Sequence, residues 1–453
     1  MQVIWAKQAL VGSDWMRDVR LEVREGRIAD IQAGVPADGD HVELLLPAPA
    51  NCHSHAFQRA MAGLTERRGP SGKDSFWTWR VLMYRFLEQL TPEQVQAITA
   101  YVQMEMLEAG FGASVEFHYL HHGHDGTPYI HLGEMSERIA AAADQSGIGL
   151  TLLPVHYQYG GCDGRPLDPG QNRFGNDPER FSRLMEDAAA SIAALPHDST
   201  LGAALHSLRA VKPADIALIA SMAPDGPVHM HLAEQVAEVE EIETAYGVRP
   251  VEWALDNIPL DRRWCLIHCT QMTPQETTRL AATRAVAGLC PLTEASLGDG
   301  IFDGVRWTEA GGAFAIGSDS NIRISLAEEL RQLDTSQRLR DHTRAALATK
   351  SRSTGRRLLE DASAGGARAA NRGNGRIELD GWADLLSLDQ THPDLEGLDG
   401  DTALDTFIFA GGREFVDAVW SGGRKLVSEG RHLRRDEISA AYRTAVLGLR
   451  REL

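Results

Sequence analysis

The sequence contains few cysteines and no pair spaced as CxxC. Five cysteines are scattered over 453 residues, and an odd, scattered set does not suit a disulfide framework. We therefore expect reduced thiols and a cytoplasmic protein. The thiols in question are Cys52, Cys162, Cys265, Cys269 and Cys290.

Long apolar runs are also missing. No stretch approaches the roughly 20 apolar residues that cross a bilayer, and the N-terminal sequence MQVIWAKQALVGSDW lacks the basic and apolar regions of a signal peptide. The sequence predicts a protein that is neither inserted into a membrane nor exported.

Basic residues are outnumbered by acidic ones. Lys and Arg total 45 whereas Asp and Glu total 63, which leaves a formal net charge of −18. A field of this sign repels nucleic acids and anionic membrane surfaces, so we expect neither as a partner. A small-molecule substrate that carries carboxylates needs a local group of Arg or His residues to override this field.

The two ends of the chain have residue patterns that are typical of a small β domain. Residues 1–46 alternate apolar and polar side chains with a period of two, and a similar pattern returns in residues 377–453, where Gly422-Gly423 suits a hairpin turn. We predict one small β-sandwich domain that is built from both ends and closed by a helix from about Glu437.

Residues 47–376 instead alternate strand-like and helix-like segments, which predicts a parallel sheet with crossover helices. Eight β/α units make a TIM-type (β/α)8 barrel. Two helix starts combine a capping threonine with proline, at Thr91-Pro92 and Thr273-Pro274, whereas DGIFDGVRWTEAGG is expected to be a loop. The eight strand candidates are VELLLPAPANCHSH, GASVEFHYL, GIGLTLLPVHY, STLGAALHSLR, GPVHMHLAE, WCLIHCTQ, AVAGLCPLT and GAFAIGSDSN.

Pairs of histidines two residues apart are the main chemical signal. With 17 histidines, roughly 0.6 such pairs would arise by chance, so a single pair proves little. The chain has three, which are His53/His55, His122/His124 and His229/His231. Position selects among them, because the chemistry of these barrels sits at the C-terminal ends of the strands. Polar residues gather at those ends, namely His53, His55, His118, Tyr119, His156, His206, His231, His268 and Asp319.

A metal site follows from these positions. His53 and His55 share one face of a strand, so both can point into the barrel mouth. A hydrolytic metal site needs one or two more protein ligands and an open position, and His231 and Asp319 are the best candidates. Three nitrogens and one carboxylate suit zinc, and also iron(II) or manganese. His229 stays open as an alternative to His231, which lies nearer the strand end.

A second metal has weaker support. His121, His122 and His124 in HYLHHGHDG are candidate ligands, but a solvated, glycine-spaced loop explains them better. The third and fourth strand candidates contain no lysine, the residue that is often modified to bridge two metals in barrels of this kind. The sequence therefore favours a single divalent cation.

Three residues are candidates for proton transfer. Glu234 follows His231 by three positions and can deliver a proton, His268 can polarise the attacking water, and Asp319 can accept the water proton. Without a metal nearby, Glu234 would be an ordinary surface carboxylate and His268 a core histidine. Together with the metal ligands, these groups predict metal-assisted hydrolysis of a C–N bond.

The combination of HSH, HLAE, IHCTQ and GSDSN resembles the amidohydrolase superfamily over essentially the whole chain, and within it the mononuclear aminohydrolase branch. The stretches HSHAFQRAMAGLTERRG, WTWRVLMYRF, VEFHYLHHG and LHSLRAV are similar to the formiminoglutamate iminohydrolase family, which acts in histidine degradation. The resemblance implies hydrolysis of N-formimino-L-glutamate to N-formyl-L-glutamate and ammonia. It also implies zinc on His53, His55, His231 and Asp319, proton handling by Glu234, His268 and Asp319, and substrate contacts from Gln58, Arg80, Tyr119, His206 and Arg209.

Arg209 and Arg80 also suit a carboxylate-bearing substrate on chemical grounds, since a planar guanidinium binds a carboxylate through two hydrogen bonds. Three alternatives stay open: an iminohydrolase for formiminoaspartate, an aminohydrolase for a purine, pterin or S-adenosylhomocysteine-like ring, and a scaffold protein without activity. A ring would need an apolar slot, and a scaffold would typically have lost the metal ligands. A homo-oligomer, a dimer in the simplest case, is also expected.

Overall fold

The computed structural model describes residues 1–66 and 76–451, with the exception of the side chains of residues 76–78, 80 and 81. Its centre is a parallel sheet with the strand order β13-β12-β11-β10-β9-β7-β6-β5, and β8 pairs with β7. The strands are β5 (Ala50–Asn51), β6 (Ala113–His118), β7 (Gly149–His156), β8 (Thr200–Leu201), β9 (Ala203–Ser207), β10 (Val228–Leu232), β11 (Trp264–His268), β12 (Val286–Leu289) and β13 (Ala313–Ile316).

Backbone hydrogen bonds close this sheet into a barrel. The Cys52 amide donates to the Ile316 carbonyl at 2.9 Å, and the Asp319 amide donates to the His53 carbonyl at 2.9 Å. These bonds join the segment after β5 to the end of β13, so the first and last strands are neighbours. The predicted (β/α)8 barrel is confirmed.

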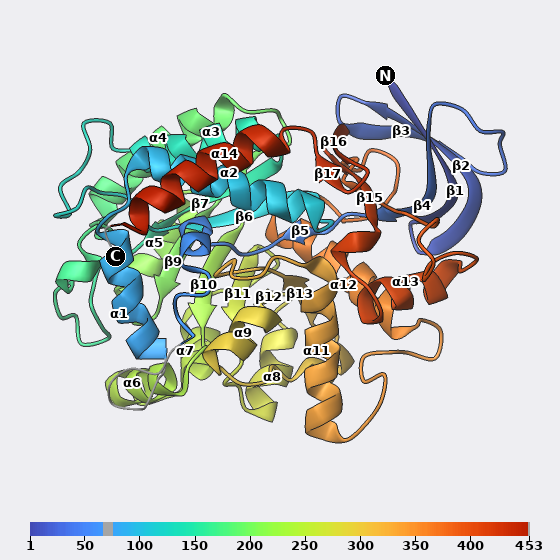
Figure 1. Cartoon of the computed structure of the whole chain (residues 1–453). Helices are drawn as coiled ribbons and strands as arrows, with labels where there is room; N and C mark the ends of the chain where they lie inside the picture. Colours follow the sequence, from blue (N-terminus) through green and yellow to red (C-terminus); the bar gives the residue numbers. More distant parts are fainter. Residues whose placement is uncertain (67–75, 452–453) are drawn as a thin grey trace.

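Helices surround the barrel (Figure 1). The predicted starts at Thr91 and Thr273 are confirmed, because both side chains accept from the backbone amide three residues later and complete a capping box. The helices are α1 (Phe76–Leu87), α2 (Pro92–Glu108), α3 (Glu134–Ser146), α4 (Pro178–Ala193), α5 (Ile216–Ser221), α6 (Val236–Tyr246), α7 (Pro250–Asn257), α8 (Pro274–Ala281), α9 (Pro291–Leu297), α10 (Gly304–Glu309), α11 (Leu326–Asp341) and α12 (Thr354–Ala369).

The loop predicted for DGIFDGVRWTEAGG is wrong, since α10 lies within it. The Asp303 side chain accepts from the Arg306 amide and caps the helix, while Trp307 is fully buried and anchors it. A helix of one and a half turns shows too little periodicity to be recognised, so only the tertiary burial of Trp307 reveals it.

The chain ends form a second sheet with the order β17-β16-β15-β14-β4-β1-β2-β3. The sheet curls over itself, because the turns at Gly26 and Gly422 touch; a Cβ on Gly26 would lie 2.8 Å from the Gly422 carbonyl oxygen. The strands are β1 (Gln2–Val11), β2 (Asp14–Arg24), β3 (Arg27–Gln32), β4 (Asp40–Pro47), β14 (Leu385–Leu388), β15 (Val416–Ser421), β16 (Arg424–Ser428) and β17 (Arg431–His432), with α13 (Gly400–Phe409) beside them in sequence. The division into domains at residues 46 and 376 stays a prediction.

Two expectations about this region need correction. The first strand candidate is two strands in two sheets, β4 and β5, because Pro47 and Pro49 lack the amides that a continuous ladder requires. The C-terminal helix α14 (Arg435–Leu449) packs on α2 of the barrel instead of closing the small sheet (Figure 1). The rings of Tyr101 on α2 and Tyr442 on α14 stack with centroids 3.9 Å apart, which fixes the helix against the barrel.

None of the helices in the described part of the chain combines the length and the apolar character that crossing a membrane requires.

A buried ion-pair network ties the barrel to the second sheet. Arg372, which follows α12, binds both carboxylate oxygens of Asp384, at 2.7 and 2.8 Å, and also contacts Asp198 at 3.1 Å. Arg424 of β16 reaches the same Asp198 at 2.6 Å. The Arg372 and Asp198 side chains are only 2% and 1% exposed, so each charge depends on its partners for solvation.

Replacing Arg372 with Met should lower the free energy of unfolding by about 3–5 kcal/mol, because Asp384 loses the cation that binds it and the buried Asp198 keeps only Arg424. Urea denaturation followed by circular dichroism measures the change. Arg17→Met is a matched control, since the Arg17–Asp399 pair is well exposed, and it should hardly move the unfolding midpoint. Equal effects of the two substitutions would contradict this account.

Candidate functional site

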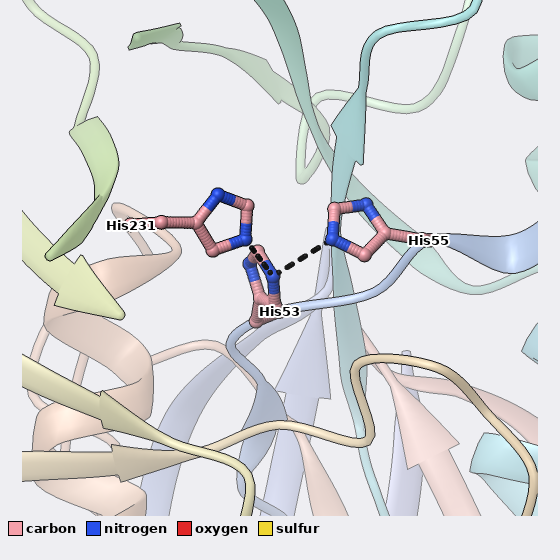
Figure 2. Close-up of side chains that lie close together, drawn as sticks. All are labelled: His53, His55 and His231. Atoms are coloured by element: carbon pink, nitrogen blue, oxygen red, sulfur yellow. Dashed lines mark hydrogen bonds between the residues drawn. The ribbon is translucent and has the colours of Figure 1, made fainter. Parts of the chain in front are cut away.

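Three imidazoles meet at the C-terminal end of the barrel (Figure 2). His53 and His55 follow β5, and His231 lies on β10. The Nε2 atom of His53 lies 3.1 Å from the Nε2 atoms of both His55 and His231. Asp319, which follows β13, brings its Oδ1 to 3.3 Å from His55 Nε2 and 3.5 Å from His53 Nε2. The structure thus brings all four predicted ligands to one point.

The far nitrogens of two of these rings are held by backbone carbonyls. His55 Nδ1 donates to the Phe117 carbonyl at 3.0 Å, and His231 Nδ1 donates to the His206 carbonyl at 2.9 Å. A carbonyl only accepts, so the hydrogen sits on Nδ1 and the lone pair of Nε2 faces the centre. Because β10 shifts register at His231, this residue pairs with Ser207 and its ring reaches the strand end.

Burial gives these side chains the charge states that a cation needs. Burial lowers the pKa of His53 to about 3, and the pKa of His231 falls well below its usual value for the same reason. Burial opposes ionisation of Asp319, but the neighbouring histidines hold its pKa below the ordinary range. Three neutral nitrogens and one carboxylate are a donor set that fits a divalent metal.

Buried amide and hydroxyl groups fasten the loop after β5 to the loop after β13. Asn51 Nδ2 donates to Ser318 Oγ at 2.7 Å, and Ser318 Oγ donates to Asn321 Oδ1 at 2.6 Å. Asn321 Nδ2 in turn donates to Ser54 Oγ at 3.1 Å and to the Asp319 carbonyl at 2.9 Å. Asp319 adopts a φ of 46°, which costs conformational energy for a residue with a side chain, and this network holds it there.

The predicted proton-handling groups lie beside the metal ligands. His268 Nε2 is 3.8 Å from Glu234 Oε1 and 3.8 Å from Asp319 Oδ2, and its Nδ1 is 3.2 Å from Glu294 Oε1. Burial alone would lower the pKa of His268, but the carboxylates around it, Glu234 first, raise that pKa well above the ordinary value. Burial raises the pKa of Glu234 to about 7, so this carboxyl can carry a proton at neutral pH.

Two further acidic residues of this site were not predicted. Glu294 on α9 holds His268 and also accepts from the Cys290 amide at 2.8 Å. Asp299, in the loop after α9, lies near Glu234 and His268, and burial followed by the charge of Glu234 raises its pKa to about 9. Their place near the end of the seventh strand candidate was the available signal in the sequence: Glu294 follows this candidate directly, and Asp299 begins DGIFDGVRWTEAGG, which was expected to be a loop.

A cavity opens above the predicted metal ligands and measures about 600 Å³ including its mouth. Four of the five predicted substrate residues line it, whereas the Arg80 side chain on α1 lies outside the described residues. A mixture of polar groups and aromatic rings suits a small polar substrate. The lining consists of His55, Gln58, Trp79, Met83, Tyr84, Tyr119, Tyr157, Phe174, His206, Arg209, His231, Glu234, His268, Thr293, Leu297, Asp319 and Ser320.

Apart from Tyr119, the aromatic part of this lining was not predicted from the sequence, which instead indicated His118 and His156 at the strand ends. His156 is buried with its ring 5.0 Å from the ring of Phe181, and it does not line the cavity. The next residue, Tyr157, faces the cavity and accepts a hydrogen bond from Gln171 Nε2 at 2.7 Å. Alternation of side chains along the strand, counted from its observed end, explains the difference.

The remaining histidine candidates do not join the centre. His229 is buried deeper in the barrel and donates to the Ala369 carbonyl at 2.9 Å. The expectation of a solvated loop is wrong for His121 and His122, which are buried; their Nε2 atoms contact the Val155 carbonyl at 2.9 Å and Asn176 Oδ1 at 3.1 Å. It holds for His124, which is exposed. Buried carbonyls explain the first two without a metal.

The choice between His231 and His229 can be tested by metal content. His231→Gln should lower metal affinity about 100-fold or more, because it removes a nitrogen that converges with His53 and Asp319. His229→Gln should retain the metal, since its ring contacts only the backbone. Elemental analysis after dialysis against a weak chelator measures both, and loss of metal from the His229 variant alone would reverse the assignment.

Comparison with known proteins adds to this geometry. The model of the amidohydrolase family matches residues 44–426, and that of the N-terminal domain of formimidoylglutamate deiminase HutF matches residues 1–42. The chain is 44% identical over 453 residues to formimidoylglutamate deiminase from Pseudomonas aeruginosa, covering 99% of each chain. It is 26% identical over 392 residues to 5-methylthioadenosine/S-adenosylhomocysteine deaminase from Natronomonas pharaonis, covering 83% of this chain and 81% of the relative.

A solved structure agrees over the same length. The crystal structure of an amidohydrolase from Brucella melitensis superposes with a TM-score of 0.95 at 48% identity, covering 99% of this chain and all of the other.

Proposed function

Because this chain belongs to the amidohydrolase family, we propose that it hydrolyses the formimino C–N bond of N-formimino-L-glutamate to N-formyl-L-glutamate and ammonia. The predicted resemblance is confirmed, since the relative matched at 44% identity over the full chain is a formimidoylglutamate deiminase. The observation that carries the proposal is one cavity that is lined by three of the four convergent ligands, by the proton-handling groups and by the buried cation of Arg209.

The cation is best held by His53, His55, His231 and Asp319. Three nitrogens with one carboxylate favour zinc, and the same set accepts iron(II) or manganese. When bound, a divalent cation supplies Lewis acidity that lowers the pKa of a water molecule to about 7. The absence of lysine from β7 and β9 supports a single cation at this centre.

The chain's own residues then move the protons. Asp319 stays ionised and accepts a proton from the attacking water, whose oxygen adds to the formimino carbon. Glu234 holds a proton near neutral pH and delivers it to the terminal nitrogen. As the bond to this nitrogen breaks and ammonia leaves, the added hydroxyl becomes the formyl carbonyl and its proton passes to the Glu234 carboxylate. His268, held by Glu294, orients the water and stabilises the negative charge that develops on its oxygen.

Arg209 explains how an acidic protein binds a dicarboxylate. Burial works against its charge, yet Glu238 and Tyr157 raise the pKa of the guanidinium, so it stays charged at 8% exposure. One substrate carboxylate pairs with this guanidinium, and Tyr119, which accepts from Gln58 Nε2 at 3.1 Å, and His206 complete the polar contacts. Arg80, whose side chain lies outside the described residues, is the partner that the family resemblance implies for the second carboxylate.

Related substrates are separated by assay. Formiminoaspartate is one methylene shorter and would place its carboxylate farther from Arg209, while adenosine derivatives carry no carboxylate for it to bind. Ammonia release should therefore be fastest with formiminoglutamate.

Assignment to the cytoplasm is supported by the five free thiols, and a homodimer stays a prediction.

Asp319→Asn should reduce kcat by at least about 10³-fold, because it removes both a ligand and the proton acceptor. An ammonia-coupled assay with formiminoglutamate measures the loss, and elemental analysis separates loss of metal from loss of proton transfer. Ser320→Ala, next in sequence and also in the cavity lining, is the control and should retain most of the activity. Substantial turnover by the Asp319 variant would overturn the mechanism.

Arg209→Gln should lower kcat/KM for formiminoglutamate by about 10- to 100-fold, mainly through KM, because a charged hydrogen bond to a carboxylate is lost. Steady-state kinetics with formiminoglutamate and with N-alkylformamidines that lack carboxylates checks the claim. The variant should treat the uncharged substrates much as the original protein does. A uniform loss across all substrates would refute the carboxylate contact.

A further inference from the structure

A second set of cation ligands lies beside the metal centre. One oxygen of Glu234, one nitrogen of His268 and one oxygen of Asp299 lie within 4.8 Å of one another, and all three residues are buried. Carboxylate and imidazole are ligands of zinc and of other divalent first-row metals. The set shares no residue with the four ligands of the first centre.

His268 has the surroundings of a metal ligand. Its Nδ1 contacts Glu294 Oε1 at 3.2 Å, the arrangement in which a carboxylate fixes the ring of a metal-bound histidine. Its Nε2 faces Glu234 Oε1 and Asp319 Oδ2, each at 3.8 Å. Ligands bonded to a tetrahedral ion at about 2.0–2.2 Å lie roughly 3.3–3.6 Å apart, so a small contraction is enough to form a site.

Asp299 provides an independent indication of a ligand. Its Oδ1 accepts from Gln235 Nε2 and its carbonyl accepts from Gln271 Nε2, and the side chain is therefore held in place. Its Oδ2 is buried without a hydrogen-bond partner among the described residues, and Asp299 as a whole is only 2% exposed. A buried carboxylate oxygen without a partner is unfavourable, and a cation would supply the missing interaction.

We propose that Glu234, His268 and Asp299 form a second, weaker site for a divalent cation such as Zn²⁺, and that a cation there inhibits hydrolysis. A cation held there occupies Glu234 and His268, the groups that otherwise move protons and orient the water. The existence of the site is independent of the proposed function, whereas the inhibition rests on it.

Metal stoichiometry of the whole protein tests the site. Protein that holds one equivalent of zinc is equilibrated with rising concentrations of ZnCl2, and bound metal is measured by elemental analysis. The original protein should take up a second equivalent, and Asp299→Asn should keep the first while binding the second at least about tenfold more weakly. Asp225→Asn removes a charge from an exposed position and should bind like the original.

A second variant, Glu234→Gln, keeps the test valid if Asp299→Asn fails to fold. Glu234→Gln should also weaken the second equivalent, and circular dichroism together with the retained first equivalent verifies that each variant is folded. A protein that binds only one equivalent in excess zinc, or variants that bind the second equivalent as tightly as the original, would overturn the proposal.

Kinetics then test the inhibition. Zinc beyond the first equivalent should slow ammonia release from formiminoglutamate, and Asp299→Asn should need about tenfold more zinc, or more, for the same degree of inhibition. Uptake of a second equivalent without any loss of rate would overturn the inhibitory role. A second equivalent in a protein that never releases ammonia from formiminoglutamate would leave the site in place and overturn the proposed function instead.

Discussion

Closure of the barrel between β5 and β13 is the constraint on which the site depends. β5 is only two residues long, so the hydrogen bonds of Cys52 with Ile316 and of Asp319 with His53 continue the pairing beyond the strand itself. This pairing runs the loop that carries His55 alongside the loop that carries Asp319. The buried Asn321 side chain then links the two loops, so ligands 266 residues apart in sequence occupy one small volume.

Burial acts in opposite directions on the acids and bases gathered there. It favours neutral imidazoles, which makes His53 and His231 good donors to a cation, and it favours a protonated carboxyl at Glu234. Asp319 differs, because the histidines around its carboxylate lower its pKa although burial acts to raise it. One environment thus separates residues of similar chemistry into the proposed ligands, the proposed proton donor and the proposed proton acceptor.

Much of the fold could be predicted from sequence patterns that extend over only a few residues. Alternation in residues 1–46, capping threonines before proline and the Gly422-Gly423 turn are local signals, and each corresponds to an element of the structure. The errors occurred where a tertiary contact decides. Helix α14 packs on α2 through the ring of Tyr442, α10 is held by buried Trp307, and His122 is buried by a distant chain segment at Asn176. None of these contacts leaves a periodic mark on the sequence.

Some residues of the candidate site could be predicted from the sequence, and others became visible only in the tertiary structure. Residue type and strand-end position by themselves determined His53, His55, His231, Glu234, His268 and Asp319 as candidates, because a parallel barrel gathers the ends of its strands whatever the loops do. Only the tertiary structure decided that Glu294 holds His268, that Asp299 lies against Glu234, and that Tyr157 rather than His156 faces the cavity. These three contacts depend on the direction in which side chains leave α9, the loop after it and the end of β7. The spacing of residues along the chain does not specify that direction.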